Sequence, residues 1–237
     1  MTAIPRQAAE ASTLRTVFVV TVGLALFVTA SVGLGLVIWR DPSAGTSTGP
    51  ADRVLPADPD AAAGHLQESS RTAAIGDVSM VLPGAPYSLY PDPMQLKGVL
   101  ESVFTASAPV HERYDGRHTW SAAVLLGRLP AAVNGDLETQ SRVTMQQLSE
   151  SIFDGHPTRL VDVTMSDHAV DGQAGLLLTG RVRYAIDGLP SHYDTLTLLL
   201  VGVDDGSVVV AATLVPNDTD AALARQAATA LESVTIS

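Results

Sequence analysis

The densest group of chemically reactive side chains in this 237-residue chain lies in one polar stretch, His-Glu-Arg-Tyr-Asp-Gly-Arg-His. Its two imidazoles and two carboxylates belong to His111, Glu112, Asp115 and His118. Such groups are ligands for divalent metals in many proteins. Their spacing here matches no metal motif, and the positive charges of Arg113 and Arg117 disfavour a cation. Polar clusters are common on surface loops, so we interpret the stretch as a solvated hairpin tip.

A second candidate is Ser191-His192-Tyr193-Asp194, which holds the three residue types of a hydrolase triad. Successive strand residues point to opposite faces, so Ser191 cannot join His192 and Asp194 on one face. Asp204-Asp205-Gly206 lies between two apolar runs and is explained as a turn. The other histidines are scattered through the expected tether and turns, at His65, His156 and His168.

These observations favour a noncatalytic protein. No serine lies in a G-x-S-x-G motif, and no Gly-rich phosphate loop precedes a predicted helix. The chain has no cysteine, which excludes disulfides, thiolate metal sites and a lipid-bearing cysteine anchor. We therefore predict no catalytic, cofactor-binding or metal-ligating residues and no cofactor, and expect that the protein is not an enzyme.

Two surface features keep a binding role open. Tyr87, Tyr90 and Met94 lie in or beside the Pro-rich stretch Pro83–Pro93, which either offers exposed aromatics to a partner or wraps an edge of its own domain. Arg181 and Arg183 share one face of a predicted strand. They either bind an anion or pair with acids on a neighbouring strand.

An α+β domain over residues 74–237 positions these side chains. Strands are predicted at 77–82, 104–108 and 120–126, and a short helix at 94–103. A helix capped by Asn134 then runs to Asp154-Gly155. Four antiparallel strands follow at 160–170, 175–186, 192–203 and 207–215, with turns at Asp171-Gly172, Asp187-Gly188 and Asp204-Asp205-Gly206. A last helix over 218–233 completes a sheet that we expect to be covered on one face by the two main helices.

This order of elements, the segment Leu178-Thr179-Gly180-Arg181-Val182-Arg183-Tyr184 and the Ala-rich helix ending in Leu231-Glu232-Ser233-Val234-Thr235-Ile236 resemble PsbP-like proteins. In actinobacteria the resemblance extends to envelope proteins such as LpqN-type lipoproteins and the alanine- and proline-rich secreted antigen. It covers about Ile75 to Ser237 and implies a small noncatalytic module of the cell envelope. The chain departs from the lipoproteins because it lacks their cysteine.

The N-terminal region predicts a membrane anchor. Residues 16–39 are uncharged and apolar, long enough to span a bilayer, and end at Trp39. Arg6 and Arg15 place residues 1–15 in the cytoplasm by the positive-inside rule, with the C-terminal domain outside. A cleaved signal peptide is the alternative, although the apolar run is longer than usual for one and no clear A-x-A site follows it. Residues 40–73, rich in Pro, Gly, Ala, Ser and Asp, are predicted to be a flexible tether.

The net charge of the region beyond the membrane segment limits the classes of partner that it can bind. Beyond Arg40 the chain holds 11 basic and 24 acidic residues, a net charge near −13, which disfavours nucleic acid and anionic lipid surfaces. We expect a single-pass membrane protein that serves as an interaction or accessory module, with envelope or secretion proteins as partners. The alternatives are a binding protein for a lipid or other apolar molecule held between sheet and helices and, as the weakest, an uncharacterised enzyme.

Overall fold

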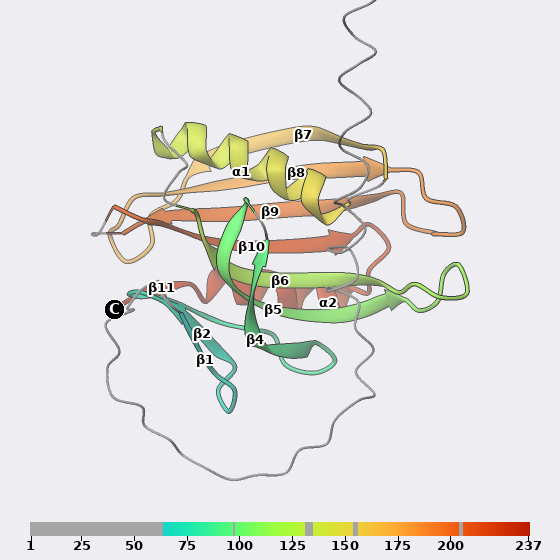
Figure 1. The fold of residues 1–237 in the computed structure, drawn as a ribbon, viewed down its shortest axis with the longest axis horizontal. Coiled ribbons are helices and arrows are strands. Elements are labelled where there is room, and N and C mark those ends of the chain that lie inside the picture. The colour runs from blue at the N-terminus through green and yellow to red at the C-terminus, as the bar shows by residue number, and fades with distance from the viewer. Residues whose placement is uncertain (1–63, 97, 131–134, 154–155, 204–205) are drawn as a thin grey trace, which may run out of the picture. The chain divides into compact units, whose positions relative to one another are not determined.

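The computed structural model describes residues 64–96, 98–130, 135–153, 156–203 and 206–237 (Figure 1). Among them no helix is both long and apolar enough to cross a membrane. The predicted membrane segment 16–39, the cytoplasmic tail and most of the predicted tether lie outside the described residues.

Seven antiparallel strands form the main sheet in the order β4-β5-β6-β10-β9-β8-β7. Their bounds are β4 Ser88–Leu96, β5 Leu100–His111, β6 Trp120–Arg128, β7 Thr158–Asp167, β8 Gly175–Tyr184, β9 Tyr193–Gly202 and β10 Val208–Pro216. The predicted pairing of residues 104–108 with 120–126 is confirmed in β5 and β6. The predicted four-strand meander is confirmed in β7 to β10, with Gly172 and Gly188 at positive φ in two of its turns.

A second, four-stranded sheet packs beside the main one in the order β1-β2-β3-β11. Its strands are β1 His65–Gln67, β2 Thr72–Ile75, β3 Val78–Val81 and β11 Thr235–Ile236. The predicted domain start at residue 74 is therefore wrong, since β1 and Ala73, which is fully buried, belong to the fold. Strands of three or four residues show too little alternation to be separated from a tether by pattern.

A hairpin replaces the short helix predicted over residues 94–103. β4 and β5 pair antiparallel there, with register shifts around Met94. Pro91 and Pro93 are tolerated because β4 is the edge strand of its sheet, where one side of the backbone has no ladder partner. Leu100 and Val103 pack closely over Gly127 of β6. A methyl group at Gly127 would meet them within 3.1–3.3 Å.

Among the described residues two helices complete the fold, α1 Leu137–Ile152 and α2 Ala221–Glu232. The N-cap of α1 is Asp136, whose Oδ1 accepts a hydrogen bond of 2.8 Å from the Thr139 amide. The predicted cap Asn134 and helix end Asp154-Gly155 lie outside the described residues. Asp220 caps α2 through a 2.7 Å bond from the Ala222 amide.

The helices lie on opposite faces of the main sheet (Figure 1), so the expectation that both cover one face is wrong. A methyl group at Gly180 of β8 would come within 3.1 Å of Met145 of α1. Val124 of β6 instead shares a buried cluster with Ala227 and Ala230 of α2. The pairing register puts Gly180 and Val124 on opposite faces. The α+β class with two main helices is confirmed.

Candidate functional site

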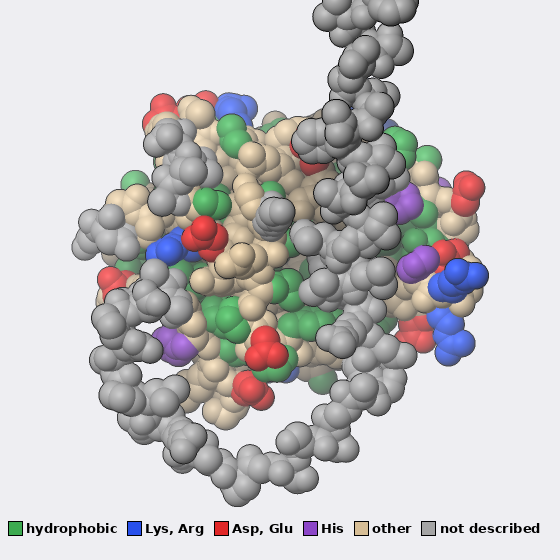
Figure 2. All heavy atoms as spheres, in the orientation of Figure 1, with side chains coloured by type: hydrophobic (Ala, Val, Ile, Leu, Met, Phe, Trp, Pro, Cys, Tyr) green, Lys and Arg blue, Asp and Glu red, His purple; other side chains and the backbone are tan. Residues whose placement is uncertain are grey.

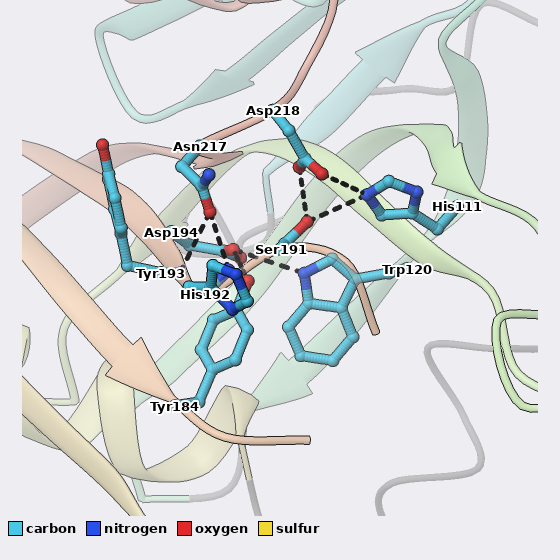
Figure 3. A network of polar contacts seen from close by, with 9 residues as sticks. All are labelled: His111, Trp120, Tyr184, Ser191, His192, Tyr193, Asp194, Asn217 and Asp218. Atoms are coloured by element: carbon cyan, nitrogen blue, oxygen red, sulfur yellow. Dashed lines mark hydrogen bonds and ion pairs between the residues drawn. The ribbon is translucent and has the colours of Figure 1, made fainter. Parts of the chain in front are cut away.

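A network of polar side chains gathers where several strands of the main sheet begin or end (Figure 3). The strand register brings these residues to the same edge of the sheet. Asp194 at the start of β9 lies opposite both Val182 of β8 and Pro216 of β10. His111 at the end of β5 lies opposite Trp120 at the start of β6. The residues drawn are His111, Trp120, Tyr184, Ser191, His192, Tyr193, Asp194, Asn217 and Asp218.

Asp194 forms the inner half of the network and is 1% exposed. Its Oδ1 accepts hydrogen bonds from the Tyr184 hydroxyl and, at 3.3 Å, from Trp120 Nε1. Its Oδ2 is buried and has no hydrogen-bond partner among the described residues. Burial raises the pKa of Asp194 to about 7, because desolvation outweighs the two donors that favour the charged form. Burial, together with the nearby Asp194 carboxyl, also raises the pKa of Tyr184.

Aromatic rings shield this end of the sheet from solvent. Trp120 lies 5.1 Å from Tyr184 and 5.5 Å from Phe153, measured between ring centroids, and Phe153 stacks on Tyr184 at 5.3 Å. Phe153 is the C-cap residue of α1, so the helix ends by covering the network. The low polarity of these rings is the physical origin of the desolvation of Asp194.

The outer half joins three segments that are far apart in the sequence. His111 Nε2 lies 2.8 Å from Asp218 Oδ2 and 3.0 Å from Ser191 Oγ, and Ser191 donates to Asp218 Oδ1 (Figure 3). Burial alone would raise the pKa of Asp218, but the Ser191 hydroxyl and the charge of His111 outweigh it, so the pKa is lowered. The Asn217 side chain accepts from the backbone amides of His192 and Tyr193 at 2.8 and 3.1 Å.

This grouping of serine, histidine and aspartate is not arranged for nucleophilic catalysis. In a hydrolase triad, one imidazole nitrogen takes the serine proton while the other is held by the carboxylate. Here the same Nε2 meets both groups, and Ser191 donates directly to Asp218. Ser191 is 1% exposed. The arrangement instead ties the end of β5 to the loops that precede β9 and α2.

The structure also separates the residues of the triad considered from the sequence. Asp194 is buried while His192 is exposed and precedes β9, so they share no site. Ser191 pairs instead with His111 and Asp218, two residues that sequence reasoning did not connect to it. One sequence signal for the inner half does exist: Asp194 has the same parity as the buried Leu196 and Leu198, so it is a carboxyl on the inward face of a strand.

The polar stretch 111–118 forms the hairpin tip between β5 and β6, where acidic, basic and histidine side chains gather (Figure 2). His111 turns away toward Asp218, whereas His118 Nδ1 contacts Asp115 at 2.6 Å. Asp115 also accepts from the backbone amides of His118 and Arg117, and these bonds lower its pKa. In the described ranges no three His, Asp or Glu side chains converge in a way that could hold a metal ion.

The Pro-rich stretch lies mostly against its own domain. Tyr87 is 2% exposed and donates to the Leu223 carbonyl of α2, while Tyr90 lies within 3.2 Å of Ser107 on the neighbouring strand. The partner-docking interpretation of Tyr87 is therefore wrong. Of the two predicted arginines, Arg181 pairs with Asp162 at 3.2 Å and lies over the Tyr193 ring at 5.3 Å.

A groove of about 540 Å³ runs between α2 and the segment that follows β3. Part of its lining is apolar, from Val81, Leu82, Pro83, Ala222 and Ala230. Val81 is 47% exposed, the largest exposed fraction among the large apolar side chains that the structure describes as exposed. Arg225, Gln226 and Thr229 add polar groups. Gln226 Oε1 is shielded from solvent and accepts no hydrogen bond from the part of the chain that the structure describes.

Comparison with known proteins finds similarity among solved structures only. No protein-family model and no curated protein sequence matches the chain. The solution structure of cyanobacterial PsbP (CyanoP) from Synechocystis sp. PCC 6803 aligns with a TM-score of 0.43 and 12% identity, over 78% of this chain and 99% of that one. The Ran-binding protein Mog1p of Saccharomyces cerevisiae aligns with a TM-score of 0.39 and 13% identity, over 68% and 90%. A Pseudomonas aeruginosa protein of unknown function aligns at 0.34 and 15%, over 62% and 92%. At these identities and scores the similarities establish neither a family nor a function for this chain.

Proposed function

We propose that this chain is a noncatalytic interaction module, tethered to the membrane by residues 16–39, whose folded domain lies outside the cytoplasm and binds a partner polypeptide of the cell envelope. The uncharged apolar segment and its basic N-terminal flank support the tether and its orientation. The assignment to PsbP-like envelope proteins of actinobacteria is part of the proposal, and rests on the order of elements and the Ala-rich closing helix.

The observation that carries a binding role is the groove beside α2. Covering exposed apolar surface is favourable for a ligand, and an unpaired, shielded acceptor is costly until a donor reaches it. Val81 supplies the first and Gln226 Oε1 the second, and both line the same groove. Arg225 at the groove forms no ion pair with the described residues. A ligand that buries apolar groups and donates a hydrogen bond to Gln226 would satisfy the first two, and an acceptor on the same ligand would pair with Arg225.

A polypeptide segment meets these requirements better than a lipid. Its side chains supply apolar contact while its backbone amides donate hydrogen bonds at regular intervals. A hydrocarbon chain would cover Val81 but leave Gln226 Oε1 unpaired. The binding of an apolar small molecule stays as the second candidate because most groups of the β3 segment in the groove are apolar.

The test is photo-crosslinking of the full chain in cells. A photoreactive amino acid replaces Thr229, which is exposed and lines the groove, or Ala228, which is exposed on the next residue of α2 and does not line it. We expect a discrete protein adduct from position 229 and not from position 228. Ala222→Trp, which fills the groove from its exposed edge, should abolish the adduct.

Equal adducts from both positions, or an adduct from position 229 that persists with Ala222→Trp, would contradict a role for the groove. An adduct whose added mass is that of a single lipid molecule would replace the polypeptide by the apolar ligand of the second candidate. Circular dichroism of the Ala222→Trp chain checks that the domain remains folded.

A further inference from the structure

A second surface, independent of the groove, lies on the open face of strands β7, β8 and β9. Arg181 and Arg183 of β8 point to this face, and the register places Arg159 of β7 directly opposite Arg183. All three arginines are exposed. α1 packs on the other face of these strands, where its Met145 lies close to Gly180. The three exposed arginines therefore form a basic patch on this side of the sheet.

The arrangement of the arginines lowers the stability of the domain when no ligand is bound. Like charges directly opposite each other on neighbouring strands destabilise a sheet. Arg181 is compensated by Asp162 and by the Tyr193 ring. Arg159 and Arg183 form no ion pair with any residue that the structure describes, so no carboxylate among those residues offsets their repulsion. An external anion placed over the pair would remove the repulsion and gain two charge-assisted contacts.

The rest of the face suits a peptide backbone. Thr179 and Thr197 lie opposite each other on β8 and β9, with their hydroxyl oxygens 3.4 Å apart, and Thr195 lies opposite Arg181. All three threonines are half-buried and share the face of the arginines. Their hydroxyls both donate and accept hydrogen bonds, as an extended segment with alternating amides and carbonyls requires.

The net charge of the chain favours a short acidic segment over a large anionic surface as the ligand of this patch. The whole chain carries a net charge of −11, and this charge repels a membrane of anionic lipids or a long polyanion over its whole contact area. A short acidic segment meets mainly the local field of Arg159 and Arg183, which falls off within about 10 Å at ordinary ionic strength.

We infer that the face formed by Arg159, Arg181 and Arg183 is a docking surface for an acidic segment of a partner protein, whose carboxylates pair with Arg159 and Arg183. Planar guanidinium groups favour such carboxylate pairing in bidentate geometry. This partner segment is chemically different from the one that suits the apolar groove.

The test uses the full chain in nonionic detergent and a fluorescein-labelled peptide of alternating glutamate and threonine. Fluorescence anisotropy measures its dissociation constant, with a peptide of glutamine and threonine as the negative probe. We expect binding of the glutamate peptide only, weakened about tenfold by the double variant R159Q/R183Q, which removes both charge-assisted contacts. The control R113Q/R117Q removes the same charge from the β5–β6 hairpin tip and should change the constant less than about twofold.

Equal weakening by the two double variants would overturn the inference, because it would show that net charge alone governs binding. Unchanged binding with R159Q/R183Q would overturn it as well. Stronger binding of the chain to phosphatidylglycerol vesicles than to the peptide, lost with R159Q/R183Q, would assign the patch to a lipid surface instead. The thermal midpoint of R159Q/R183Q should equal or exceed that of the unmodified chain, since a repulsive pair is removed.

Discussion

Asp194 is a carboxyl group held in a place that favours its neutral form. Three aromatic rings surround this end of the sheet, and one carboxylate oxygen has no partner among the described residues. The Tyr184 and Trp120 donors hold the other oxygen. Burying a charged carboxylate with one oxygen unpaired is destabilising, so the protonation of this residue should be visible in the stability of the whole domain.

The sign of the effect follows from the direction of the pKa shift. The folded-state pKa of Asp194 is about 7, above the ordinary aspartate value of 3.8. Between those values the folded carboxyl keeps its proton while the unfolded one loses it. The stabilisation present at low pH is therefore lost as pH rises toward 7, by about 1.4 kcal/mol per pH unit, and is gone above the folded pKa.

Asp194→Asn removes this titration while keeping the acceptor oxygen. The free energy of unfolding of the variant minus that of the unmodified chain should become more favourable by roughly 3 kcal/mol between about pH 5 and pH 8. Urea unfolding of the full chain in nonionic detergent, followed by circular dichroism at both pH values, measures this difference. A difference that does not change with pH would show that Asp194 titrates normally in the folded protein.

Residue-level chemistry was predictable only in part. The spacing of His192 and Asp194 predicted a shared strand face, but His192 is exposed before β9 begins and Asp194 is buried. The contact of Ser191 with His111 and Asp218 depends on how distant strand ends meet, which no local pattern records. Asp194 was visible as an acid at the inward parity of a Leu-rich strand, but only a known partner strand shows what surrounds it.

Among the elements, α1 is held to the sheet by a small set of side chains. Leu148 is fully buried and Met145 is 1% exposed beneath β8, where Gly180 permits close approach. Val143 on the same helix is 40% exposed. The stability of the helix in the domain therefore depends on one face and not on the helix as a whole.

Leu148→Ala should lower the free energy of unfolding by about 3 kcal/mol, because it removes buried apolar surface and leaves a cavity. Val143→Ala should change it by less than about 1 kcal/mol, since that side chain is already in contact with solvent. Urea unfolding of both variants provides the comparison. Similar losses in the two variants would mean that α1 contributes through helix formation and not through docking.

Elements with a long, regular pattern were predicted well, and short or edge elements were not. The meander β7 to β10 follows from four apolar strand segments separated by Asp-Gly turns. β1 and β2 are too short to show a period, and β4 contains prolines that suggested a helix start. An edge strand accepts these prolines because its outer backbone groups need no ladder partner.

At the scale of the whole molecule, the main wrong prediction was that both helices cover the same face of the sheet. Nearly every residue of β10 is buried, from Val208 through Pro216, which is typical of a strand covered on both sides. This pattern already favours helices on opposite faces over two helices on one. The basic patch lies on the face that α2 and the small sheet cover in part, beyond the buried cluster that Leu199 and Val201 join.

The proposal for the whole chain depends first on its topology. A reporter that is active only outside the cytoplasm, fused after Ser237, combined with a carbonate wash of the membranes, tests the tether and the orientation together. The account predicts an active reporter that stays with the washed membranes. An inactive reporter would contradict the extracytoplasmic domain, and active reporter released into the medium would contradict the tether.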